Sequence, residues 1–218
     1  MEHLGTEYGG WWVPTDMKLN TVYSVGVGED ISFDLHLQSK YGCDIFLVDP
    51  TKKAKIHFDE FVEDRSFTGN IQNDYLENIK ELSVDKSKFH FIPKGLWNHD
   101  GELKFYRQSN PNYVSQSLVE GMFSAEYDIV PVMTLPNDVK IDLLKMDIEG
   151  AECNVLEHML DNEIYPTYLL IEFDLILKSK DPTGETKKII ERLMRTGYTL
   201  LKDDNWNMTF SNQPQGDK

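Results

Sequence analysis

The chain has 218 residues, of which 40% are hydrophobic and 27% charged, a balance typical of a globular domain long enough to bury a complete core. Its net charge of −15 provides no basic footprint for phosphate groups, so we expect no nucleic acid partner. The sequence has no run of about 18 apolar residues, which argues against a membrane-spanning helix. Residues 1–6 lack the basic start and apolar run of a signal peptide, so we expect a cytoplasmic chain with no membrane partner.

Apolar runs and amphipathic segments alternate along the chain, which predicts a parallel sheet between helices. The first five core strands are expected at residues 22–27, 45–48, 89–92, 141–146 and 168–173. Helices are expected at residues 30–41, 51–61, 151–161 and 183–196, where apolar residues recur three or four positions apart. Gly42 and Gly197 stand where these helices should stop. The last helix should bury Ile189, Ile190, Leu193 and Met194.

Several segments between these elements lack a regular pattern. Residues 62–82 should form a surface segment with one short helix, and residues 130–135 a short strand. The Asp100-Gly101 pair is a tight-turn signal between apolar runs and predicts a hairpin over residues 96–106. Residues 107–126 are polar and should form a loop, which could close over a site.

The expected fold is therefore a single doubly wound α/β domain over residues 1–218, with about seven core strands. The last two strands, at residues 198–201 and 208–210, should pair antiparallel. Cys43 and Cys153 match no zinc or disulfide spacing and are expected to be small buried residues of a reduced protein.

Two regions flank or interrupt this domain. Residues 1–20 form an N-terminal lid or extension, whose Trp11-Trp12 pair either covers the site or plugs the core. Residues 96–135 form an insertion of hairpin and loop. The pattern does not specify an oligomeric state.

The first strand ends in Gly26-Val27-Gly28, and the second ends in Asp49 about 20 residues later. Glycines there allow a tight turn and a close approach of a ligand to the main chain. A carboxylate at the end of the second strand can accept both hydroxyls of an adenosine ribose. Together these features predict an adenosine-containing cofactor at the carboxyl edge of the sheet.

The residues after Gly28 distinguish between cofactors. A dinucleotide site needs a third glycine where this chain has Ile31, and a helix N-terminus open to pyrophosphate. Glu29 and Asp30 would repel pyrophosphate, whereas they suit the amino group or sulfonium of S-adenosylmethionine. We therefore expect S-adenosylmethionine as the cofactor.

Four segments, in chain order, carry a family resemblance: residues 24–33, 48–51, 95–97 and 141–152. The most specific is Leu144-Lys145-Met146-Asp147-Ile148-Glu149-Gly150-Ala151-Glu152. The chain resembles the FkbM-type branch of class I S-adenosylmethionine-dependent methyltransferases over nearly its whole length. This resemblance implies a seven-stranded sheet with a reversed last strand.

The resemblance also implies roles for individual residues. Gly26 and Gly28 would line the methionine part of the cofactor, and Asp49 would hold the ribose. Gly95-Leu96 would lie near the adenine, and Asp147 would lie beside the transferred methyl group.

One position departs from the common pattern of such enzymes. Many of them carry an acid two residues before the first glycine, and this chain has Ser24 there. Glu29 or Asp30 would then meet the methionine ammonium.

An alcohol acceptor must lose its proton to a carboxylate or histidine within hydrogen-bond reach. Asp147, Glu149 and Glu172 stand at the carboxyl ends of the fourth and fifth strands and are the candidates for this role. Asp147 and Glu149 could instead only cap the following helix, and Lys145 is expected to form a structural ion pair. Asp147, Glu172 and Asp174 could form a divalent metal site, but no regular spacing supports one, so we expect no metal.

The resulting expectation is a methyltransferase that acts on an oxygen of a small molecule or sugar, the oxygen acceptor being implied by the resemblance. Two alternatives stay open. Ser24 leaves room for a catalytically silent S-adenosylmethionine-binding protein that acts through partners. A nicotinamide-dependent oxidoreductase is disfavoured by Ile31 and the acids that precede it.

Overall fold

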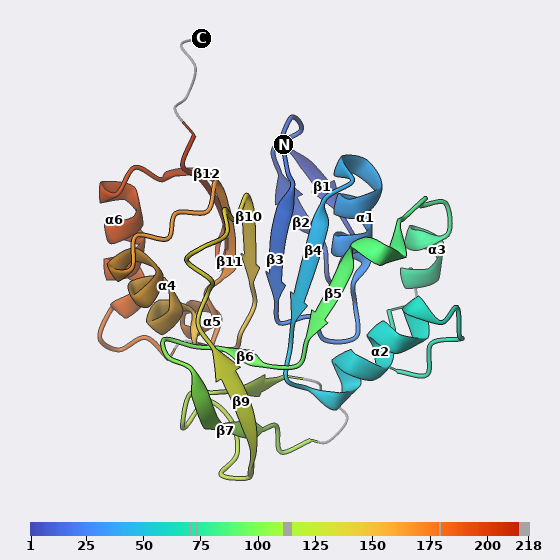
Figure 1. Cartoon of the computed structure of the whole chain (residues 1–218). Coiled ribbons are helices and arrows are strands. Elements are labelled where there is room, and N and C mark those ends of the chain that lie inside the picture. Colours follow the sequence, from blue (N-terminus) through green and yellow to red (C-terminus); the bar gives the residue numbers. More distant parts are fainter. Residues whose placement is uncertain (70, 73, 111–114, 179, 214–218) are drawn as a thin grey trace.

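A seven-stranded sheet forms the centre of the protein (Figure 1). The computed structural model describes residues 1–69, 71–72, 74–110, 115–178 and 180–213. The strands, in spatial order, are β12 (Thr199–Asp204), β13 (Asn207–Ser211), β11 (Tyr168–Glu172), β10 (Leu143–Met146), β3 (Thr21–Val25), β4 (Asp44–Val48) and β5 (Phe89–Ile92). Within this sheet β13 runs opposite to the other six strands, which all point the same way. The α/β class, the seven strands and the antiparallel final pair agree with the sequence predictions.

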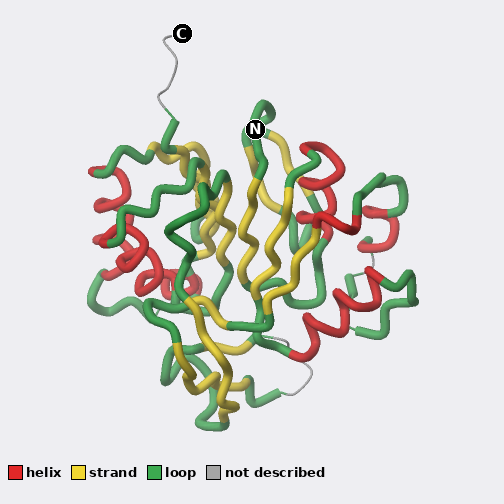
Figure 2. Tube along the Cα trace, viewed as in Figure 1, coloured by secondary structure: helices red, strands yellow, loops and turns green. Residues whose placement is uncertain are grey.

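Helices cover both faces of this sheet (Figure 2). The helices are α1 (Ser32–Tyr41), α2 (Lys52–Val62), α3 (Tyr75–Ile79), α4 (Glu152–Asp161), α5 (Asp174–Leu177) and α6 (Glu185–Arg195), with a short 3₁₀ turn at Lys86–Lys88. Successive strand residues point to opposite faces, so Leu143 packs with α1 and α2 whereas Leu144 packs with α4 and α6. The parallel strands are therefore buried on both sides, which explains their nearly continuous apolar sequences.

Helix α1 ends at the predicted glycine, and α2 begins at a side-chain cap. Gly42 adopts a left-handed conformation at the end of α1, and its N–H donates to the Gln38 carbonyl. The Thr51 side chain accepts a hydrogen bond from the Ala54 N–H and caps α2. One prediction is wrong: Met194 in α6 is 53% exposed, because its side chain falls outside the buried stripe that contains Ile189 and Leu193.

A second sheet contains β6 (Gly95–Leu96), β9 (Tyr127–Met133), β7 (Gly101–Arg107) and β8 (Gln116–Ser117), in that spatial order. The predicted hairpin over residues 96–106 is wrong, because β9 lies between β6 and β7 and pairs with both. The turn at Asp100-Gly101 exists, yet a turn signal does not determine which strand fills the neighbouring position. Phe105, Val130 and Val132 form a small core under this sheet.

The segment predicted as a loop at residues 107–126 contains the short strand β8 and several turns. Residues 111–114 of this segment lie outside the described residues, and its closure over a site stays a prediction.

The N-terminal residues form a two-stranded antiparallel sheet of β1 (Glu2–Leu4) and β2 (Trp11–Val13). Leu4, Trp11 and Val13 join the core beside α1, and the Trp12 carbonyl accepts a hydrogen bond from Thr209 in β13 at 2.8 Å. This segment therefore packs against the body of the domain. Among the described residues, no helix combines the length and apolar character needed to cross a bilayer.

Candidate active site

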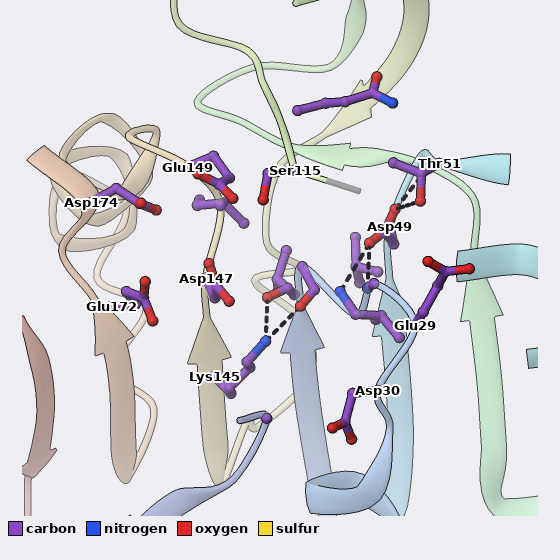
Figure 3. Close-up of a pocket in the computed structure, with 18 of the residues that line it drawn as sticks. Glu29, Asp30, Asp49, Thr51, Ser115, Lys145, Asp147, Glu149, Glu172 and Asp174 are labelled. Carbon is purple, nitrogen blue, oxygen red and sulfur yellow. Dashed lines mark hydrogen bonds between the residues drawn. The ribbon is translucent and has the colours of Figure 1, made fainter. Parts of the chain in front are cut away.

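A cavity of about 770 Å³ opens at the carboxyl ends of β3, β4, β10 and β11. Its walls come from the main sheet, the second sheet and the N-terminal segment at residues 8–11. This is the edge at which parallel α/β sheets bind ligands, and the volume suits a small molecule. Figure 3 shows two halves, with Asp49, Glu29 and Asp30 on one side and Asp147, Glu149, Glu172 and Asp174 on the other.

Most residues predicted for the site line this one cavity. They are Gly26, Gly28, Glu29, Asp30, Asp49, Gly95, Leu96, Asp147, Glu149 and Glu172. Ser24 is absent from the lining and is fully buried within β3. The carboxyl ends of parallel strands share an edge, which explains why residues distant in sequence meet here.

The glycine loop after β3 is shaped by the neighbouring strand. Gly26 has φ of 76° and Gly28 has φ of 59°, both in the left-handed region that favours glycine. A Cβ on Gly26 would lie 1.7 Å from the carbonyl oxygen of Asp147. Close packing of two backbones therefore requires glycine at position 26, independently of any ligand.

The Asp49 carboxylate holds this loop in place. Its Oδ2 accepts hydrogen bonds from the N–H groups of Val27 and Gly28 at 2.9 and 3.0 Å. Its Oδ1 accepts from the Thr51 N–H at 2.7 Å and from the Thr51 hydroxyl at 2.6 Å. Both oxygens are thus engaged by protein donors, and the ribose contact expected of Asp49 stays a prediction.

Glu29 and Asp30 differ in their availability. Asp30 accepts hydrogen bonds from the Thr6 hydroxyl at 2.6 Å and from the Ser32 N–H at 2.9 Å, so it ties the N-terminal segment to the start of α1. Glu29 lines the cavity, and its Oε2 is buried without a hydrogen-bond partner in the described chain. Glu29 is therefore the acid of this pair that has acceptor capacity left for a ligand.

Lys145 supports the loop from behind. Its ammonium group donates to the carbonyl oxygens of Gly26 at 2.6 Å and of Val25 at 3.3 Å, and it lies 5.9 Å from the centre of the Trp11 ring. The structural ion pair predicted for Lys145 is wrong, because main-chain carbonyls take its hydrogen bonds.

A buried acid behind β3 was not anticipated from the sequence. Asp34 in α1 is 3% exposed, and burial raises its pKa to about 6, against the opposing effects of Lys145 and the Ser24 hydroxyl. Asp34 and Gln38 lie four residues apart on the buried face of α1. Polar residues at helical spacing within an apolar face were the signal that could have revealed this acid.

Three carboxyl groups meet beyond β10 and β11. Asp147 follows β10, Glu172 ends β11 and Asp174 begins α5; one oxygen of each lies within 4.8 Å of the others. Burial raises the pKa of all three, and the neighbouring negative charges add to the effect. The pKa of Glu172 reaches about 8, and that of Asp174 about 7.

The β10–α4 turn carries two further acids. Lys178 forms ion pairs with Glu149 and Asp174, and Glu149 has a left-handed φ of 59°. Glu152 is fully buried and accepts hydrogen bonds from the N–H groups of Ile148 at 3.3 Å and Gly150 at 2.9 Å. Neither Asp147 nor Glu149 makes a side-chain capping bond to α4 in the described chain, and the hydrogen bonds of Glu152 hold the turn that precedes the helix.

Gly95 and Leu96 lie in β6, where the two sheets meet. Leu96 is 1% exposed and provides an apolar wall of the cavity. A Cβ on Gly95 would lie 3.1 and 3.2 Å from the side chains of Leu118 and Val132, so glycine here leaves room for both.

Fold and cavity together define an α/β protein with a cavity at the carboxyl edge of a seven-stranded sheet. A comparison with family models matches residues 17–200 to the methyltransferase FkbM domain. The chain therefore belongs to the FkbM methyltransferase family, as the sequence motifs predicted. Comparisons with curated proteins and with solved structures found no match.

Proposed function

We propose that this protein transfers a methyl group from S-adenosylmethionine to a hydroxyl oxygen of a small molecule or sugar. The observation that carries the proposal is the single cavity that joins the glycine loop to a carboxylate-rich wall inside an FkbM methyltransferase domain. The order of the strands in the main sheet, with a reversed strand β13 between β11 and β12, supports the class I fold expected for such enzymes.

The residues of the loop half of the cavity fit this cofactor. The unpartnered Oε2 of Glu29 would accept a hydrogen bond from an ammonium or hydroxyl group. The main chain at Gly26 and Gly28 and the apolar wall at Leu96 would hold the rest of the molecule. S-adenosylmethionine, when bound, supplies an activated methyl carbon.

The other half of the cavity would receive the acceptor. Asp147, Glu149 and Glu172 line the cavity near the ends of β10 and β11 (Figure 3). One of these groups, in its ionised form, would take the proton of the acceptor hydroxyl as the new bond forms, and the others would orient that hydroxyl. Because the donor is already activated, alignment by this rigid wall supplies much of the acceleration.

The catalytically silent alternative rested on Ser24. Ser24 is fully buried and does not line the cavity, so its side chain would not touch a ligand bound there. Within the part of the chain that the structure describes, we find no observation that favours this alternative.

Calorimetric titration tests the cofactor. The wild-type chain should bind S-adenosylmethionine and S-adenosylhomocysteine and leave NAD unbound. Glu29→Gln should weaken the binding of S-adenosylmethionine at least about tenfold, which corresponds to about 1.4 kcal/mol, because an NH₂ group replaces one of the two acceptor oxygens. Glu81→Gln, at an exposed position away from the cavity, is the matched control. The proposal fails if neither sulfur compound binds, or if only NAD does.

A labelled-methyl assay tests the chemistry. Transfer from methyl-labelled S-adenosylmethionine to a panel of sugars and small alcohols should give a methyl ether with the wild-type chain. Asp147→Ala should abolish transfer while leaving the cofactor dissociation constant within about tenfold of wild type.

A further inference from the structure

Asp147, Glu172 and Asp174 form a compact oxygen-rich cluster on the wall of the cavity. One oxygen from each residue lies within 4.8 Å of the others, and the three side chains come from β10, β11 and the start of α5 (Figure 3). The registered pairing of β10 with β11, Met146 opposite Ile171, sets this proximity, so the cluster rests on rigid elements.

The hydrogen bonds around the cluster leave it incomplete. Asp174 is 1% exposed, and its Oδ2 is buried with no hydrogen-bond partner in the described chain, although Lys178 occupies its Oδ1. Asp147 and Glu172 accept no side-chain hydrogen bond and form no ion pair within the described residues. A buried oxygen without a donor is costly, so a positive ligand at this point would stabilise the arrangement.

The nearby ammonium groups do not fill this space. Lys178 is shared between Asp174 and Glu149. Lys145 donates to the carbonyls of Val25 and Gly26. Asp147 and Glu172 therefore face the cavity without a paired cation from the described chain.

The geometry points to a divalent cation site formed by Asp147, Glu172 and Asp174. Carboxylate oxygens are the ligands of hard cations such as Mg²⁺ and Mn²⁺, which prefer six oxygen ligands in octahedral geometry. Three carboxylates leave coordination positions open, and the cavity lies on that side of the cluster. The cation site stands independently of methyl transfer; only its use in holding an acceptor oxygen rests on the proposed function.

Binding of Mn²⁺ alone tests this inference. The full chain, freed of metal by chelation, is titrated with MnCl₂, and free Mn²⁺ is followed by electron paramagnetic resonance. We expect a single saturable site in the wild-type chain. Glu172→Gln and Asp174→Asn should each weaken Mn²⁺ at least about tenfold, because each removes one anionic ligand. Glu191→Gln, at an exposed position on α6, should bind as the wild type does.

Circular dichroism of each variant verifies that it is folded before titration. Absence of saturable binding by the wild-type chain overturns the inference, and so does unchanged affinity in a folded Glu172→Gln. The assay contains no S-adenosylmethionine, so its failure is distinct from failure of the proposed function. A chain that binds the cofactor but not Mn²⁺ would keep the proposed function and lose the cation site.

Discussion

Replacing Asp49 with asparagine should destabilise the fold as well as the site. The Asp49 carboxylate accepts hydrogen bonds from Val27, Gly28 and Thr51, two of them at each oxygen. Asparagine has nearly the same shape but a single acceptor oxygen. Whichever way its amide turns, one pair of donors must face an NH₂ group.

The structure allows the size of this effect to be worked out. Asp49 is 5% exposed, so water cannot readily replace the lost acceptor. Each buried donor left unpaired costs about 1–3 kcal/mol. With the amide oxygen toward Val27 and Gly28, the Thr51 hydroxyl can turn and accept from the NH₂ group, so the Thr51 N–H is the donor left unpaired, at a cost of about 2 kcal/mol. For a chain of this length, each 1 kcal/mol lowers Tm by about 2–4 °C, so a fall of roughly 4–8 °C is expected.

Asp59→Asn is the matched control. Asp59 pairs with Lys55 at 2.6 Å on the surface of α2, four residues away along the helix. Such a pair contributes about 0.3–0.5 kcal/mol, so this variant should melt within about 2 °C of wild type. Melting curves by circular dichroism compare the two variants. If Asp49→Asn melts with the control while losing affinity for S-adenosylmethionine, the loop-holding role is refuted and the ribose role predicted for Asp49 is favoured.

Two further substitutions probe the surroundings of the loop. The raised pKa of Asp34, about 6, means that its contribution to stability is full below about pH 4 and is lost as pH rises through 6. Asp34→Asn should therefore raise the free energy of unfolding by up to about 3 kcal/mol at pH 8 and by little at pH 4; urea titrations giving equal shifts at both pH values would contradict this. Gly26→Ala should cost about 2–5 kcal/mol because its Cβ would collide with the Asp147 carbonyl. Gly121→Ala, with φ of 85° and open space around the new Cβ, should cost only about 1–2 kcal/mol, and equal losses would refute the collision.

Local signals in the sequence were sufficient to predict most of the strands and helices of the main sheet. Alternation of apolar runs with amphipathic segments identified the parallel strands and the longer helices, because burial on both faces of a sheet imposes that pattern. Gly42 and Gly197 marked helix ends because both adopt the positive φ that favours glycine after the last helical turn. The sequence also indicated where the cavity lies, since the carboxyl ends of parallel strands share one edge.

Contacts between distant segments were decided only by the tertiary structure. The turn at Asp100-Gly101 was visible in the sequence, but β9 displaced the predicted hairpin because strand pairing is selected by packing across the whole sheet. Lys145 donates to the carbonyls of Val25 and Gly26 at the end of β3 because of the register between β10 and β3, which no local pattern encodes.

For the side chains of the cavity, too, some features follow from the sequence and others from the tertiary structure. The sequence by itself determined that carboxylates follow β10 and β11 and that glycines follow β3, because these are properties of single strand ends. Only the packed structure decided that Asp49 is engaged by the loop, that Glu29 keeps an unpartnered oxygen, and that the Asp147, Glu172 and Asp174 oxygens converge. Each of these depends on distances between elements, which are set by the pairing of strands and the packing of helices rather than by neighbouring residues in the chain.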